Sequence, residues 1–159
     1  MKWSWKISAV ALLVIAGSLL CLLWKQGEPR RDSIKTLNVF SHALVSEDSA
    51  VLLDKIVLPR AFQGDTISEQ SEFLIKALHD EISPGGVLAI KRHAAFGSLE
   101  KIFPDETAAW CKQANVNPDN CVAFKMEHAG IRAEVVLVRE GNVYRVLRCN
   151  NVKQMAENS

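Results

Sequence analysis

The stretch CVAFKMEHAGIRAEVVLVREGNVYRVLRC, residues 121–149, decides the predicted fold. Apolar and polar side chains alternate over residues 122–127, and this period of two indicates a strand with one buried face. Two turn signals follow, AG at 129–130 and EGN at 140–142, and each precedes another apolar run. We therefore expect three strands, of which the last two form an antiparallel hairpin. These two strands are residues 131–139 and 143–149.

The residues before this stretch predict helices and one further strand. Apolar side chains recur there at three- and four-residue steps, as on the buried face of a helix, and Ser33, Ser46 and Ser68 occupy favourable N-cap positions. The expected helices are residues 33–44, 46–57, 68–82 and 105–114, and the expected strand is residues 87–92. Ser83-Pro84-Gly85-Gly86 is expected to end the third helix, and residues 151–159 are expected to form a frayed tail.

Helices followed by an antiparallel sheet predict an α+β domain, with three helices packed on one face of a curved antiparallel sheet. The order resembles the NTF2-like, cystatin-like cone. The segments that carry the likeness are LNVFSHALVSEDSAVLLDKIV (37–57), SEQSEFLIKALHDEIS (68–83) and IRAEVVLVREGNVYRVLRC (131–149). The resemblance covers about residues 33–150 and rests on element order alone. It implies a long helix packed into a strongly bent sheet, with a pocket between them.

The first 25 residues predict a membrane anchor. Ile7–Trp24, ISAVALLVIAGSLLCLLW, is an uncharged run of 18 residues. As a helix it would span roughly 27 Å, close to the ~30 Å hydrocarbon core of a bilayer. Trp3 and Trp5 stand at one end and Trp24 at the other, as in the aromatic belts of spanning helices. We expect an uncleaved anchor over residues 1–25 and a linker over 26–32.

Two alternatives compete with an uncleaved anchor. A cleaved signal peptide would release a soluble secreted factor, but no Ala-x-Ala-like site follows the run. A lipoprotein signal would modify Cys21, but leucine directly before this cysteine fits poorly. The short basic head before the apolar run favours a domain on the extracytoplasmic side, with a bacterial inner membrane as the expected site.

The charge of the chain argues against nucleic acid as a partner. Residues 1–25 hold three of the 19 basic groups and none of the 18 acidic groups, so the remaining 134 residues carry a formal charge of −2. Binding to a phosphate backbone requires a clustered basic surface. The histidines and cysteines lack the close-spaced pairs of a zinc site, so no metal or cofactor is predicted.

Cys111 and Cys121 bracket a predicted turn and are ten residues apart. In an oxidising compartment a disulfide between them would close a short loop. The alternatives are two reduced, buried thiols, or a bridge that uses Cys149 instead. No Cys-x-x-Cys motif is present, which argues against thioredoxin-type redox chemistry.

Catalytic candidates are suggested by the resemblance, because enzymes of the cone superfamily, the isomerases and dehydratases, use an Asp or an Asp/His group inside the pocket. The candidates here are His128, Glu127 and His93, although none matches a family catalytic position. By strand alternation His128 shares a face with Phe124 and Met126, which would direct it inward. The competing expectation is a solvent-exposed histidine at a strand end.

The sequence therefore favours a membrane-tethered, non-catalytic domain that binds a partner protein or a small ligand at the cell envelope. A homodimer formed through the open sheet face is a further expectation. A pocket enzyme of isomerase or dehydratase type, working through His128 or Glu127, is the first alternative. A secreted soluble factor is the second.

Overall fold

The computed structural model describes residue 18 and residues 27–55 and 76–157. The chain divides into two compact units, Met1–Arg31 and Asp32–Ser159, and the second contains the sheet. The predicted span, residues 7–24, lies outside the described residues apart from Ser18. Among the helices of the described part, none is long and apolar enough to cross a membrane.

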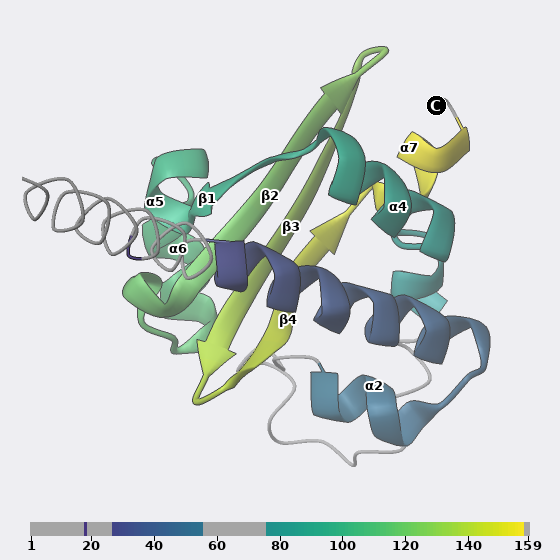
Figure 1. The fold of residues 1–159 in the computed structure, drawn as a ribbon, viewed down its shortest axis with the longest axis horizontal. Coiled ribbons are helices and arrows are strands. Elements are labelled where there is room, and N and C mark those ends of the chain that lie inside the picture. The colour runs from purple at the N-terminus through teal and green to yellow at the C-terminus, as the bar shows by residue number, and fades with distance from the viewer. Residues whose placement is uncertain (1–17, 19–26, 56–75, 158–159) are drawn as a thin grey trace, which may run out of the picture. The chain divides into compact units, whose positions relative to one another are not determined.

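The domain is built on a four-stranded antiparallel sheet in the order β1-β2-β3-β4 (Figure 1). Its strands are β1 (Ala95–Ser98), β2 (Cys121–His128), β3 (Ile131–Glu140) and β4 (Val143–Asn150). The α+β class is confirmed, as is the hairpin of β3 and β4. The pairing of β3 with β4 shifts its register between Val136 and Leu137, where a β-bulge interrupts the ladder.

The prediction of helices on one face alone is wrong, because helices cover both faces of this sheet. The helix of residues 27–45, from Asp32 onward, shares one face and one apolar core with α2 (Ser49–Lys55), α4 (Pro84–His93) and α7 (Val152–Glu157). Two short helices, α5 (Leu99–Ile102) and α6 (Thr107–Ala114), pack on the other face. A 3₁₀ turn, Pro118–Asn120, leads from α6 into β2.

The alternation along the strands divides the core between these two faces. Phe124, Val135 and Leu137 are fully buried and face the larger helical layer. Ala123 and Val136, one position away, are also fully buried and face α5 and α6. The middle of the sheet is therefore apolar on both sides, as expected for strands covered by two layers.

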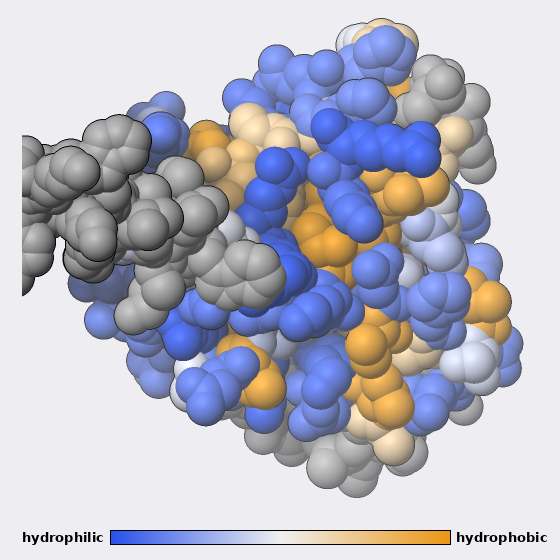
Figure 2. Space-filling model, viewed as in Figure 1, coloured by the Kyte–Doolittle hydropathy of each residue, from blue (hydrophilic) through white to orange (hydrophobic). Residues whose placement is uncertain are grey.

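The surface of the described residues is mainly hydrophilic on the side shown in Figure 2, with apolar residues gathered toward the middle of that view. Among the described residues, the large apolar side chains that remain exposed are Val39, Val45, Leu88 and Val143. The described apolar side chains are otherwise largely used in the two cores.

The predicted strand at residues 87–92 is wrong, because these residues lie in α4. Ser83, expected to end a helix, instead begins one: its Oγ accepts a hydrogen bond from the Gly86 N–H at 3.1 Å. Pro84 takes the first helical position, where its missing N–H costs nothing. Val87 and Ile90 are buried three residues apart, a spacing that a helix face and an apolar run share.

The expected frayed tail is also wrong, because residues 152–157 form α7. Val152 and Met155 are completely buried, and the backbone of α7 lies directly on Gly86. A Cβ on Gly86 would overlap the carbonyl group of Val152. The two glycines of α4 therefore allow close packing of α7 on α4. From the sequence, the same glycines are interpreted as part of a helix terminator.

The expected linker at residues 26–32 is helical from Gly27 onward, and the helix predicted to begin at Ser33 is already formed there. Glu28 and Arg31 form an ion pair at 3.9 Å, with the three-residue spacing that a helix brings together. Asp32 and Lys35 form another at 3.0 Å. Of the predicted helix 68–82, only residues 76–82 are described, and residues 76–79 are helical.

Candidate functional site

A surface hollow of about 480 Å³ lies where β2 runs past the start of β1. Its lining residues are His93, Ala95, Lys125, Met126, Glu127 and His128. The three catalytic candidates from the sequence are therefore brought to one place, although they come from the end of α4 and the end of β2. This place is a rim of the sheet and not the space between the sheet and its helices.

Local structure explains this arrangement. α4 ends at His93, and the chain turns at Ala94 into β1, which pairs Ala95 with Lys125. β2 continues for three more residues before the turn at Ala129-Gly130. The end of α4 and the last residues of β2 thus enclose the hollow, with buried Met126 in its lining.

Glu127 is poorly suited to act as a general base. Its carboxylate forms an ion pair with the Lys125 ammonium at 2.9 Å and is largely exposed. The hydrogen bond and the charge of Lys125 hold the pKa of Glu127 below its ordinary value. A lowered pKa makes a weaker base, whereas a catalytic carboxylate needs a pKa raised by burial.

The two histidines of the hollow are exposed to solvent. His128 lies on the inward side of β2 by alternation, after buried Phe124 and Met126, yet it is exposed because the strand ends there. Of the two alternatives for His128, the solvent-exposed histidine at a strand end is the one found, and the inward-pointing histidine is wrong. His93 is exposed at the last position of α4.

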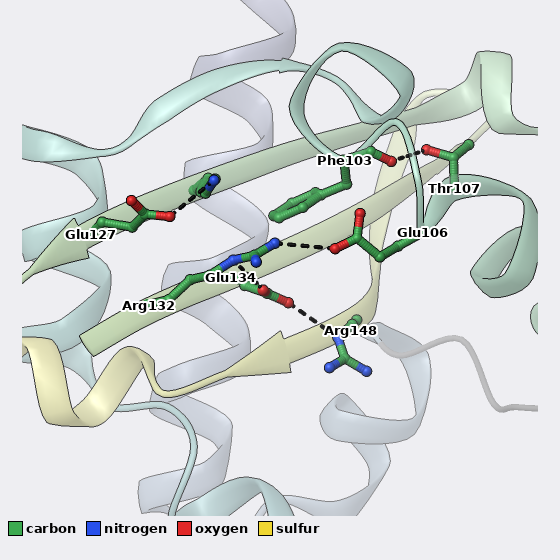
Figure 3. A network of polar contacts seen from close by, with 8 residues as sticks. Phe103, Glu106, Thr107, Glu127, Arg132, Glu134 and Arg148 are labelled. Atoms are coloured by element: carbon green, nitrogen blue, oxygen red, sulfur yellow. Dashed lines mark hydrogen bonds and ion pairs between the residues drawn. The ribbon is translucent and has the colours of Figure 1, made fainter. Parts of the chain in front are cut away.

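Glu134 is the one buried carboxylate among the described residues, with the residue 7% exposed. One oxygen contacts Nε of Arg132 at 2.7 Å, and the other accepts a hydrogen bond from Nε of Arg148 at 3.4 Å (Figure 3). Arg132 also contacts Glu106 at 3.3 Å. The acceptor capacity of the carboxylate is thus used by two guanidinium groups, which is a structural arrangement.

Aromatic rings complete this network. The guanidinium of Arg132 lies 5.2 Å from the ring centre of Phe103, and that of Arg148 lies 4.8 Å from the ring centre of Trp110. Phe103 and Trp110 contact each other edge to face, with ring centres 5.2 Å apart. The two arginines that contact Glu134 therefore also pack on the aromatic rings that cover this face of the sheet.

The sequence indicated the arginines of the hairpin, because Arg132 and Arg148 lie on strands with glutamates as neighbours. It did not indicate that Glu134 is buried between them. Register decides this point: Glu134 pairs with Asn150, so Arg148 lies two positions along on the same face. A one-residue bulge in the same ladder places that arginine, and a bulge leaves no clear sequence signal.

The structure brings the Cys111 and Cys121 thiols within hydrogen-bonding reach of each other, both as free thiols. Burial and the neighbouring Cys111 raise the pKa of Cys121 to about 12, and burial also raises the pKa of Cys111. Cys149 packs against the other core, across the sheet. The disulfide between Cys111 and Cys121 stays a prediction. Cys149 faces the opposite side of the sheet from both of them, so it does not replace either partner.

Metal binding finds no support in the described part of the chain. No group of three or more His, Cys, Asp or Glu side chains there is arranged to hold an ion. A smaller hollow of about 140 Å³, lined by Trp110, Leu147 and Arg148 among others, lies between α6 and β4 and contains no histidine or carboxylate.

Comparisons with known proteins provide no relative for this chain. No protein-family model, curated protein or solved structure matches it. Any inference about function therefore rests on the residues and their geometry.

Proposed function

We propose that the chain is a membrane-tethered, non-catalytic domain that binds a partner protein at the cell envelope. The observation that carries the non-catalytic part is the apolar character of the described buried residues. The buried residues between the sheet and its larger helical layer are apolar, apart from the hydroxyl side chains of Ser33 and Ser41. A domain whose described core residues on this side of the sheet include no acid or base is suited to recognition through its surface.

The alternative of a pocket enzyme fits this geometry less well. Its candidate residues lie on an open rim, and Glu127 has a lowered pKa through Lys125. The one buried carboxylate, Glu134, is held by two arginines. Glu127 therefore lacks the raised pKa that a carboxylate needs for general-base catalysis near neutral pH.

The membrane anchor is proposed from the sequence. An uncharged run of 18 residues with tryptophans at both ends is long enough to span a bilayer, and lysines flank it. An extracytoplasmic domain on a bacterial inner membrane is part of the same proposal. The secreted soluble factor remains the alternative outcome of the test.

We also propose an NTF2-like relationship, at the level of architecture. The packing of residues 32–45, a helical segment, against an antiparallel sheet supports it, whereas half of the long helix that carries the resemblance, residues 68–83, lies outside the described residues. The described core residues on this side of the sheet are apolar, which agrees with a domain that has no enzymatic function.

Membrane extraction tests the anchor. We expect the full chain to stay in the membrane pellet after alkaline carbonate treatment, and N-terminal sequencing to find Met1-Lys2 intact. A variant with Val14→Lys and Ile15→Lys should leave the pellet, because two central charges each cost several kcal/mol in hydrocarbon. Val14→Leu with Ile15→Leu is the matched control. A mature chain that begins after Trp24 would contradict the tether.

Turnover assays test the non-catalytic part. We expect the full chain in detergent micelles to show no turnover of ketosteroid or hydroxyacyl substrates of the isomerase and dehydratase classes. Turnover that disappears in both His128→Ala and Glu127→Gln would establish the enzyme alternative.

A further inference from the structure

We propose that the end of β2 beside β1 is a strand-addition site, where a short extended segment of an acidic partner protein pairs with the backbone of Glu127. This inference rests on the proposed function, because it assigns the partner surface of a binding domain and the chemistry of the partner.

The first observation is the mismatch in length between the two strands. β1 has four residues and β2 has eight. Ala95 and Lys125 form the last pair between them, so β2 beyond Lys125 pairs with β3 alone. The end of β2 is therefore a free sheet edge, and such an edge is a template for another strand.

The register shows which residue of this edge directs its backbone groups outward. Ala129 and Gly130 have φ values of 49° and 79°, as in the two-residue turn that favours tight hairpins. In such a hairpin the flanking residues, His128 and Ile131, exchange hydrogen bonds, and the next pair does not. Glu127 and Arg132 are that next pair, so the N–H and C=O of Glu127 point away from β3.

A contact on the opposite side supports this alternation. The Arg132 carbonyl, which by the same rule points away from β2, accepts a hydrogen bond from Nδ2 of Asn151 at 3.1 Å. The chain thus satisfies the outward carbonyl on β3 with its own C-terminal segment. For the backbone N–H and C=O of Glu127, the described residues supply no equivalent partner.

Space for a ligand is present at this edge. The hollow of about 480 Å³ lies against residues 125–128, with His93 and Ala95 as its other lining residues. Met126 is buried and His128 is exposed, so alternate positions along the edge offer an apolar and a polar contact. A segment that continues the line of β1 would occupy this hollow and add a strand to the sheet.

The charges of the rim favour an acidic segment. α4 ends in Arg92 and His93, and His93 lines the hollow. Glu127 is the one carboxylate among the described residues that line it, and Lys125 already pairs with that carboxylate at 2.9 Å. The surplus of positive charge comes from the end of α4 and is complementary to glutamate or aspartate side chains.

Fluorescence anisotropy with a labelled peptide tests the proposal. The probe is the capped peptide Glu-Val-Glu-Val-Glu-Val, and the protein is the full chain in detergent micelles. We expect saturable binding of this peptide and at least tenfold weaker binding of the peptide in which lysine replaces glutamate. No binding of the acidic peptide, or equal binding of both peptides, would overturn the proposal.

Two substitutions at one position isolate the backbone contact. Glu127→Pro removes the outward N–H without removing a β2–β3 hydrogen bond, whereas Glu127→Gln removes the same charge and keeps the N–H. We expect about tenfold weaker binding for the proline variant than for the glutamine variant. Equal binding by two folded variants would exclude the strand-addition geometry.

A charge reversal keeps the test valid if the proline variant does not fold. Arg92→Glu should weaken acidic-peptide binding severalfold, and Lys112→Glu on exposed α6 should leave it unchanged. Equal effects of the two reversals would contradict the assigned surface. Membrane extraction is independent of these measurements, so a tethered chain that fails to bind the peptide refutes this inference and leaves the anchor proposal standing.

Discussion

Buried polar side chains are the residues whose chemistry most constrains this domain. Glu134 lies between Arg132 and Arg148, and Cys121 lies against Cys111 under α6. In both places a titratable group is removed from water and given one or two specific partners. Each place therefore yields a measurable consequence when the residue or the pH is changed.

Glu134→Gln should lower the free energy of unfolding by about 1–3 kcal/mol, because the buried oxygens no longer carry the charge that both guanidinium groups contact. Glu140→Gln is the matched control, since Glu140 pairs with Arg145 at 3.1 Å but is 47% exposed. We expect this control to cost less than about 1 kcal/mol. Chemical denaturation of the full chain measures both, and equal losses would contradict the role assigned to Glu134.

The raised pKa of Cys121 predicts a loss of stability in alkali. An unfolded thiol ionises near its ordinary pKa of 9.0, whereas the folded thiol ionises at about 12. Between these values only the unfolded state loses the thiol proton. The contribution of Cys121 to the free energy of unfolding is therefore complete below pH 9 and declines as the pH rises toward 12. For the reduced protein we expect the Cys121 thiol to lower the free energy of unfolding by an amount that approaches about 1.4 kcal/mol per pH unit in this range.

Cys121→Ala serves as the control for this slope. Because other groups also titrate in alkali, the informative quantity is the difference between wild type and variant in urea denaturation from pH 8 to pH 10.5. The slope should be smaller in the variant, and it should also be smaller once Cys111 and Cys121 are oxidised to a disulfide. Parallel slopes would show that Cys121 is not buried as described.

At the scale of elements, the packing of α7 on α4 is the feature that completes the larger core. Glu81 joins the two helices: its side chain accepts a hydrogen bond from the Asn151 N–H at 2.5 Å, and its carbonyl accepts one from the Lys153 N–H at 3.0 Å. The close approach is possible because Gly86 has no side chain.

Gly86→Ala should destabilise the domain by about 1–3 kcal/mol, because the added methyl group would overlap the Val152 carbonyl. Gly85→Ala is the matched control, because its Cβ would lie 3.2 Å from the Cβ of Ala156 and the helix gains propensity. We expect this change to stay within about 1 kcal/mol. Denaturation and limited proteolysis of α7 measure the effect, and identical behaviour would contradict the packing.

The sheet could be predicted from the sequence and the helices on it only in part. Alternation in residues 122–127 and the turns at 129–130 and 140–142 each have one structural interpretation, and the structure has strands at these places. The run from Val87 to Arg92 has two, because a short apolar segment fits a helix or a strand. In the structure the segment is a helix, and Ser83 is its N-cap. In the sequence, the Ser-Pro-Gly-Gly motif that begins this helix resembles a motif that ends one.

The candidate site could be predicted as a set of residues but not as a place. His93, Glu127 and His128 were chosen for their chemistry, and they do line one hollow. Their exposure follows from the ends of α4 and β2, and segment ends are the positions that sequence patterns locate least well. The free edge at Glu127 exists because β1 is only four residues long. No sequence pattern in these four residues predicts where β1 begins and ends.

At the scale of the whole molecule, a predicted membrane anchor precedes a domain whose described core residues are mainly apolar and whose proposed recognition surface is a sheet edge. The anchor would hold this edge at a membrane surface, where a partner of the same compartment reaches it. Anchor and edge are separable, since the first lies in residues 1–25 and the second in the hollow beside β2.

The most direct test of the central claim is thiol labelling of the domain in intact bacterial spheroplasts. Asn142→Cys places one exposed thiol on the β3–β4 turn, while burial raises the pKa of the described native thiols and so slows their labelling. A membrane-impermeant maleimide should label this variant as fully in intact spheroplasts as after lysis, with the chain still in the membrane fraction. Labelling that requires lysis would contradict an extracytoplasmic, membrane-tethered domain.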